Sequence, residues 1–280
     1  TSNYFFVADI GDALYYLPAT ALTLEPGGGG ASGTSTPAAS AYVPLIALPS
    51  RDVTAANASD ALTQTQLAIQ DRVQRLTISV PSPLCGDIYQ AIYTHLSGLA
   101  NAQIAKYNQA DLRSMEVGYR SGSSAYVYVN FSYGSAPHDA EVDQVVSAKY
   151  AEFAALPNDY EKVLAVHDWL CGLVDYREDA YDCHTAYGAL VRHQAVCDGY
   201  ALSFQRFMDA LGIPCYVATG IRNNEAHAWN LVQLNGQWYH LDTTWDDQSR
   251  GLIRDYFLIS GPQAGYLSWG NITLAPSNYR

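Results

Sequence analysis

Apolar positions recur at helical spacing in two stretches of the second half of the chain. In the first stretch, Asn158 and Glu161 have the spacing of a capping box, which predicts a helix from Asp159 onward. Its apolar face would comprise Leu164, His167, Leu170, Cys171 and Val174. A second helix is predicted from about Cys197 to Gly212, because a glycine directly follows the last apolar residue of the periodic run.

Strict alternation of apolar and polar positions predicts a hairpin after these helices. Two alternating runs, residues 227–234 and 237–242, are joined by Asn235-Gly236. This dipeptide favours a two-residue turn of type I′, in which both residues have positive φ. With these two residues as the loop, Trp229 would face Asp242 across the hairpin.

The first half of the chain has a mixed pattern of helices and strands. Residues 75–80 and 125–133 alternate like strands, whereas 87–99 and 142–156 have helical periodicity. Residues 26–40 are nearly all Gly, Ala, Ser, Thr and Pro, a composition typical of a flexible linker. We therefore divide the chain into three parts: an N-terminal segment (1–50) that includes this linker, an α+β region (51–157) and a C-terminal core (158–280).

Composition narrows the classes of partner. The 280 residues carry a net charge of -12, and only 15% are charged, against about 25% in an average domain. Phosphate binding needs clustered Lys and Arg, so neither nucleic acid nor an anionic membrane surface is expected as a partner. The sparse charge and abundant small polar residues indicate an extracytoplasmic or secreted protein. The first 50 residues contain no Lys or Arg, so we expect no signal segment in this chain, and no run of apolar residues predicts a membrane span.

The five cysteines stand at irregular spacings and do not predict a disulfide framework. Because their number is odd, at least one thiol must be free or paired to another molecule. Cys197 is the candidate, since it lies where the second predicted helix begins. Unpaired amides and the helix dipole at such an N-terminus stabilise a thiolate, which predicts a lowered pKa and a nucleophilic sulfur.

The predicted hairpin supplies a base for this nucleophile. His227 and Asp242 would lie on one face of the sheet as diagonal neighbours, close enough for an imidazole to reach a carboxylate. A carboxylate on one ring nitrogen fixes the orientation and tautomer of the other. Cys197, His227 and Asp242 together would form a triad for thiol acyl transfer, without a metal or a cofactor.

Five segments around these residues resemble the transglutaminase-like superfamily of papain-fold thiol enzymes, in its bacterial secreted form. They are DYEKVLAVHDWL (159–170), TAYGALVRHQAVCDGYA (185–201), LGIPCYVATG (211–220), AHAWNLV (226–232) and WYHLDTTWDD (238–247). The resemblance implies an α+β fold in which the helix that begins with Cys197 packs on an antiparallel sheet carrying His227 and Asp242. It also implies that these three residues are the catalytic triad.

Other candidate residues are less strongly indicated. Relatives often use an upstream aromatic side chain or a glutamine as the second donor to the oxyanion, which makes Tyr187 and Gln194 the candidates here. Trp229 and Trp245 are expected to line the active cleft. His167 and Asp168 are neighbours on a helix and are expected to point in different directions, His167 into the core and Asp168 toward solvent.

The resemblance implies a class of chemistry but leaves the acceptor open. Transfer of the acyl group to water would make the protein a protease or amidase, and transfer to an amine would make it a crosslinking enzyme. The substrate would be a peptide or protein, and the resemblance also admits a cell-wall peptide. The alternative is an extracytoplasmic binding or surface protein that keeps the fold as a scaffold with an idle triad.

Overall fold

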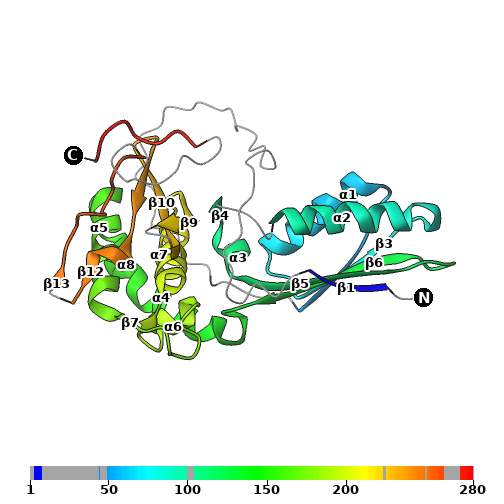
Figure 1. Ribbon diagram of the computed structural model, residues 1–280, viewed down its shortest axis with the longest axis horizontal. Coiled ribbons are helices and arrows are strands. Elements are labelled where there is room, and N and C mark those ends of the chain that lie inside the picture. The colour runs from blue at the N-terminus through cyan, green and yellow to red at the C-terminus, as the bar shows by residue number, and fades with distance from the viewer. Residues whose placement is uncertain are drawn as a thin grey trace.

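The computed structural model describes residues 3–7, 44, 49–99, 104–222, 225–249, 251–261 and 272–279. The predicted linker at 26–40 lies outside these residues. The described part of the chain forms two lobes that lie side by side, an N-terminal lobe on the right of Figure 1 and a C-terminal lobe on the left. Both contain helices and sheet, so the α+β fold class is confirmed.

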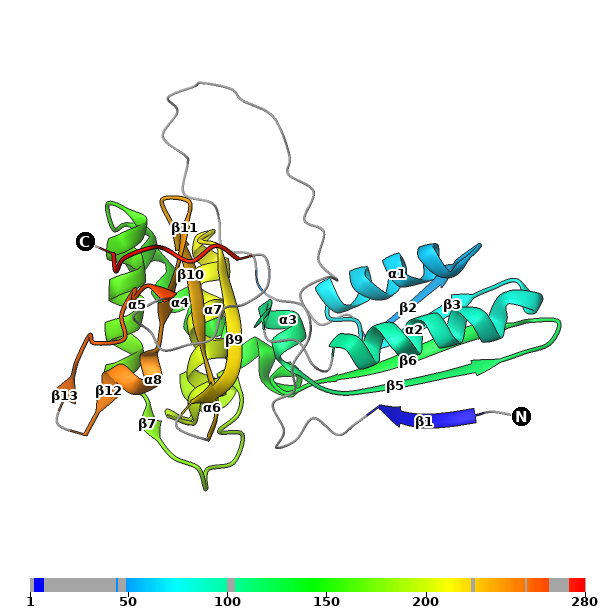
Figure 2. The same ribbon diagram turned by 45° about the horizontal axis from the view of Figure 1, so that its top comes forward.

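The N-terminal lobe is a five-stranded sheet covered on one face by two helices (Figure 2). The strand order is β1-β5-β6-β3-β2, and only the β2–β3 pair is parallel. The elements are β1 (Asn3–Val7), β2 (Ser50–Thr54), α1 (Ala58–Gln70), β3 (Arg75–Ser79), η2 (Ser82–Leu84), α2 (Cys85–Leu99), β5 (Leu112–Arg120) and β6 (Tyr126–Tyr133). The alternation predicted at 125–133 is confirmed by β6, whose residues at odd positions from Val127 to Tyr133 are buried against the helices.

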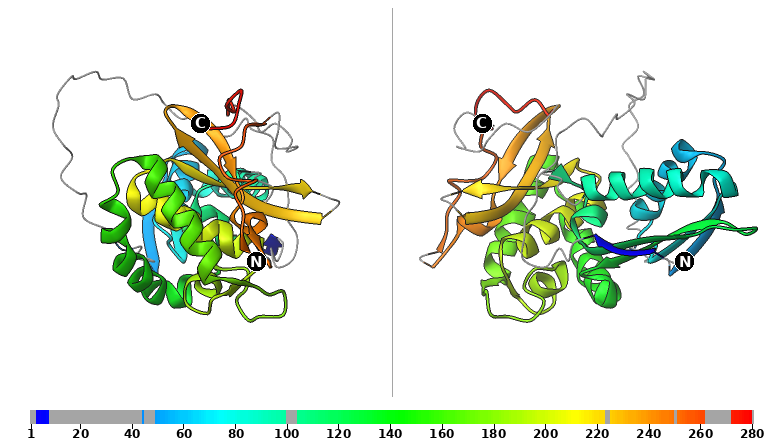
Figure 3. Two further views of the ribbon diagram at one scale, coloured as in Figure 1. Left: turned by 90° about the vertical axis from the view of Figure 1, so that its left-hand side faces the viewer. Right: turned by 45° about the vertical axis from the view of Figure 1, so that its right-hand side comes forward.

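The C-terminal lobe packs helices against an antiparallel four-stranded sheet of order β11-β10-β9-β4. Its elements are β4 (Ile104–Ala105), α3 (Tyr107–Ala110), η3 (Ala136–His138), α4 (Asp139–Ala154), α5 (Asp159–Leu173), β7 (Asp175–Tyr176), α6 (Ala186–Leu190), β8 (Gln194–Ala195), α7 (Cys197–Leu211), β9 (Cys215–Arg222), β10 (Glu225–Leu234), β11 (Gln237–Leu241), α8 (Thr243–Asp246), β12 (Asp247–Gln248) and β13 (Gly251–Leu252). Figure 3 shows this sheet from two further sides, and its strands β9 and β10 pair antiparallel and pack against α7.

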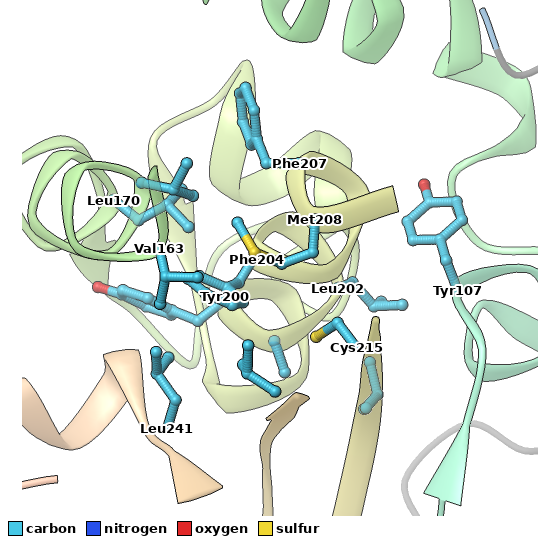
Figure 4. Packing of buried hydrophobic residues seen from close by; sticks show 14 of the residues in the cluster. Tyr107, Val163, Leu170, Tyr200, Leu202, Phe204, Phe207, Met208, Cys215 and Leu241 are labelled. Carbon is cyan, nitrogen blue, oxygen red and sulfur yellow. The ribbon is translucent and has the colours of Figure 1, made fainter. Parts of the chain in front are cut away.

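Helix α7 lies at the centre of this lobe and is buried almost all round. Figure 4 shows Phe204, Phe207 and Met208 of α7 among side chains from several other elements. These include Leu170 of α5 and Leu241 of β11, both fully buried. A helix enclosed in this way has little freedom to shift, so its first residue is held in a fixed position relative to the sheet.

Local sequence signals account for the ends of these elements. The side chain of Asn158 accepts a hydrogen bond from the backbone N–H of Glu161 at 2.9 Å, as the predicted cap requires. Helix α7 ends at Gly212, whose φ of 71° is the left-handed conformation that glycine adopts at low cost. In the hairpin, Asn235 and Gly236 have φ of 51° and 76°, which confirms the predicted turn.

Buried charge connects the two lobes. The guanidinium of Arg72, just after α1, lies 3.0 Å from Asp111 and 3.1 Å from Asp139, and its side chain is fully buried. Helix α4, which contains Asp139, packs with the core of the C-terminal lobe. Separating the lobes would break these ion pairs and leave buried charges uncompensated, which is energetically costly. The contact therefore holds the lobes in one arrangement. Among the described residues, no helix has the length and apolar character needed to cross a membrane.

Candidate active site

Cys197 is the first residue of α7, as predicted. Val196 before it is extended, and the chain then turns tightly into the helix. The first turn of α7 packs closely against the segment before it, and Gly199 makes this packing possible. A Cβ at this position would lie 2.6 Å from the carbonyl oxygen of Cys183 and 2.8 Å from the Cβ of Ala195. The nucleophile candidate therefore lies at a helix N-terminus whose backbone is packed against the preceding loop.

His227 and Asp242 meet through their side chains. The Nε2 atom of His227 lies 2.6 Å from Oδ2 of Asp242, and both residues are buried, Asp242 completely. The predicted register is confirmed up to the pair Asn230–Leu241. Beyond it the prediction was wrong: β11 ends at Leu241, and Asp242 caps the short helix α8 instead of facing Trp229 across a strand pair. The carboxylate still reaches the imidazole, because the cap position projects it toward β10.

Helix α8 contributes a second contact to His227. Oδ1 of Asp242 accepts a hydrogen bond from the backbone N–H of Trp245 at 3.1 Å. The Trp245 ring then stacks on the His227 ring, with centroids 4.8 Å apart and planes inclined by 26°. One helical turn thus fixes both the carboxylate that binds the imidazole and the ring that packs on its face.

A cavity of about 220 Å³ opens over these residues. It is lined by Tyr176, Cys197, Glu225, Ala226, His227, Thr244 and Trp245. Trp245, which was expected to line the active cleft, is among these residues. Trp229 is buried behind His227, where its indole N–H donates to Nδ1 of His240 at 2.8 Å, and it is not among the lining residues. Alternation along the strand places Trp229 on the same face as His227. It does not show that other residues cover Trp229 and keep it out of the cavity.

The electrostatics around Cys197 differ from the expectation of a stabilised thiolate. Burial, together with the negative charges of Asp198 and Asp242, raises the pKa of the Cys197 thiol to about 12. The backbone amides of Ala228 and Asp198 lower this pKa, but their effect is smaller than that of burial. The prediction of a lowered pKa was wrong for this resting arrangement, because it considered the helix N-terminus and left out burial and the neighbouring negative charges.

Neither predicted oxyanion donor is among the residues that line the cavity. The Tyr187 ring stacks on His138 of the 3-10 helix η3, at 3.8 Å between centroids, and Gln194 belongs to the two-residue strand β8. Tyr176 lines the cavity instead. Strand β7 pairs with β8 so that Tyr176 lies opposite Ala195, two residues before Cys197. Burial, followed by the charge of Cys197, raises the pKa of Tyr176 to about 12, so its hydroxyl stays protonated and able to donate.

The other thiols are separate from this cavity. Cys85, Cys171, Cys183 and Cys215 are buried, and all five cysteines are free. Burial raises the pKa of each of these four thiols. The prediction of buried, reduced cysteines without a disulfide framework is confirmed, and Cys197 is the cysteine that lines the cavity.

Comparison with known proteins identifies the family of this region. The model of the transglutaminase-like superfamily matches residues 148–243, a range that contains Cys197, His227 and Asp242. Residues 148–243 belong to the transglutaminase-like superfamily. The match confirms the resemblance that the five sequence segments indicated, and with it the transglutaminase-like core.

Two curated relatives extend beyond this chain. Human kyphoscoliosis peptidase is 24% identical over 165 residues, which cover 53% of this chain and 24% of the relative. The mouse protein of the same name is 24% identical over 204 residues, 65% of this chain and 30% of the relative. The chain therefore spans less than a third of the length of these relatives.

Solved structures overlap with the chain only loosely. A structure described as a TGase has a TM-score of 0.35 at 16% identity, covering 73% of this chain and 61% of its own. The periplasmic domain of TgpA from Pseudomonas aeruginosa has a TM-score of 0.30 at 16% identity, covering 43% of this chain and 54% of its own. Because both TM-scores are below 0.5, the assignment rests on the family model.

Proposed function

We propose that this protein is a thiol acyl-transfer enzyme that acts on amide bonds of peptides or proteins. Cys197 would be the nucleophile, His227 the general base, and Asp242 the group that orients His227. The observation that supports this proposal most directly is the 2.6 Å contact between His227 and Asp242, beside a cavity that His227 shares with Cys197.

The hydrogen bonds define how the base would work. Because Nε2 of His227 faces a carboxylate, it carries a proton, and Nδ1 is the nitrogen free to accept the proton of the thiol. As that proton moves, the sulfur attacks the substrate carbonyl carbon and the carbonyl oxygen gains negative charge. The Tyr176 hydroxyl and the backbone N–H of Cys197 would donate to this oxygen. Collapse of the intermediate breaks the C–N bond, and His227 returns its proton to the leaving amine.

The thioester that remains on Cys197 would be resolved by a second nucleophile. Water would give a free acid, the outcome of a protease or amidase, and an amine would give a new amide. The two curated relatives are named peptidases, which favours water. A peptide or protein is the proposed substrate, with a cell-wall peptide among the candidates, and an extracytoplasmic location is proposed on the grounds of composition.

One observation favours a second function, a binding protein with an idle triad. Burial and two carboxylates raise the pKa of Cys197, so the thiol is neutral at physiological pH. An enzyme with this resting state depends on proton transfer to His227 during the attack. A scaffold protein would have no such requirement.

Capture of the acyl-enzyme separates the two functions. The protein is incubated with a library of peptides, and covalent adducts are located by mass spectrometry. We expect an acyl group on Cys197 that is absent in Cys197→Ala and lost in His227→Ala. Cys85→Ala and His193→Asn are matched controls that remove a buried thiol and an exposed imidazole elsewhere, and both should retain the adduct. The proposed enzyme would be contradicted if the wild-type protein forms no adduct, or if the adduct still forms in His227→Ala.

A further inference from the structure

A second histidine lies buried behind the candidate site. His167 of α5 is fully buried, although the core around it is largely apolar. Its Nδ1 atom lies 3.0 Å from Oδ1 of Asp168, and its Nε2 atom lies 3.1 Å from Oδ2 of Asp246. The expectation that His167 and Asp168 point in different directions was wrong, because the Asp168 side chain folds back over the ring.

The hydrogen-bond geometry defines the protonation state of this ring. Ionised carboxylates only accept hydrogen bonds, so a histidine between two of them donates from both nitrogens and is an imidazolium. The Arg254 guanidinium binds the outer side of Asp168, at 2.5 and 3.2 Å. The positive charges of His167 and Arg254 then balance the negative charges of Asp168 and Asp246 within one cluster. Contact with the two carboxylates also raises the pKa of His167 against the effect of burial.

Asp246 connects this cluster to the candidate site. It is the last residue of α8, and its backbone N–H donates to the carbonyl oxygen of Asp242 at 3.1 Å. Its second carboxylate oxygen accepts a hydrogen bond from the backbone N–H of Tyr256 at 2.9 Å. The carbonyl of Tyr256 in turn accepts from the N–H of Asp242 at 3.1 Å. The carboxylate of Asp246 therefore ties α5, α8 and the segment at Tyr256 together.

Helix α8 needs such contacts, because a helix of one turn is not stable by itself. Its four residues and their cap supply Asp242, Thr244 and Trp245 to the candidate site. Helix α5 contacts both ends of α8. His167 binds Asp246, the last residue of α8, and the Cys171 thiol donates to the carbonyl oxygen of Thr243, the first residue of α8, at 3.5 Å.

We propose that His167 is a positioning residue for the candidate active site: as a buried imidazolium it holds Asp246, and through α8 it holds Asp242 and Trp245 against His227. The catalytic part of this inference rests on the proposed function. The geometric part, the placement of Asp242 on His227, does not require that the protein turns over any substrate.

The test therefore uses one readout of geometry and one of reactivity. In His167→Gln, proton NMR follows the signal of the His227 Nε2–H proton, which a short bond to a carboxylate shifts far downfield. Alkylation of Cys197 by iodoacetamide at neutral pH is measured by mass spectrometry. We expect the downfield signal to be lost and the alkylation rate to fall about tenfold, the size of one charge-assisted hydrogen bond. His193→Asn, which removes an exposed imidazole, should change neither.

A merely structural role for His167 would lower the midpoint of urea unfolding and leave both readouts unchanged in the folded protein, and that result would overturn the proposal. If His167→Gln does not fold, Asp246→Asn decides the question, since it keeps an acceptor for the N–H of Tyr256 but loses the charge that faces His167. A double variant, His167→Gln with Asp246→Asn, replaces the ion pair with an amide pair and should recover part of the lost reactivity. Failure of the wild-type protein to form an acyl-enzyme would contradict the proposed function but leave the NMR result intact.

Discussion

Tyr176→Phe is the most selective perturbation of the proposed oxyanion site. The change removes one hydroxyl from the cavity and keeps the ring, which is about half exposed, so we expect little effect on the free energy of unfolding. Loss of one oxyanion donor typically reduces an acyl-transfer rate about 10²- to 10³-fold, which corresponds to roughly 3–4 kcal/mol. The backbone N–H of Cys197 would remain as the other donor, so we expect about a 100-fold loss rather than complete inactivity.

The assay compares two reactions of the same sulfur. p-Nitrophenyl acetate acylates a thiol through a tetrahedral oxyanion, and its reaction is followed as a burst of nitrophenol. Iodoacetamide alkylates the thiol by direct displacement, without an oxyanion. Tyr176→Phe should slow acylation about 100-fold and leave alkylation within about twofold. Equal loss of both reactions would mean that Tyr176 acts on the thiol itself, and no loss in either would refute its role as a donor.

Two further substitutions test the surroundings of the nucleophile. Asp198→Asn removes a charge that raises the pKa of Cys197, so this pKa should fall by about one unit. Alkylation of Cys197 at pH 8.5 should then be about tenfold faster. The control Asp179→Asn, on the exposed loop, should leave this rate unchanged. A slower or equal rate in Asp198→Asn would contradict the electrostatic account. Gly199→Ala forces a methyl group against backbone atoms and should lower the free energy of unfolding by about 1–3 kcal/mol in urea titrations. Gly172→Ala is its control, since the added Cβ would meet no described atom within 4 Å apart from its chain neighbours and the backbone of its own helix. This substitution should stabilise the helix by up to about 1 kcal/mol. Equal effects of the two substitutions would show that the space around Gly199 is not limiting.

The candidate triad could be predicted from sequence because each part depends on a local signal. Asn235 and Gly236 determine the turn, and the turn determines the register as far as Asn230 and Leu241. Alternation along β10 then places His227 on the face that Asp242 reaches as the cap of α8. The start of α7 at Cys197 follows from the apolar spacing behind it and the glycine that ends it. These signals act over a few residues, so they do not depend on how the lobes pack.

The parts that sequence did not predict depend on contacts between distant segments. Tyr176 reaches the cavity through a two-residue parallel pairing of β7 with β8, which is too short to leave a pattern. The contact between His167 and Asp246 joins positions 79 residues apart. The burial of Trp229 could not be predicted either. Alternation assigns a strand residue to one face of the sheet but does not show which residues cover that face.

The raised pKa of Cys197 makes the geometry behind His227 more important for reactivity. A thiol that is already ionised at rest can attack even when its histidine is poorly oriented, because no proton has to move. A neutral thiol at physiological pH reacts only as fast as the base can take its proton, and that step depends on the direction of the Nδ1 lone pair. That direction depends on Asp242 and Trp245, and these depend on α8. Contacts that hold α8 should therefore change the reactivity of Cys197 without touching it, and their effect should be larger below the pKa of the thiol than near it.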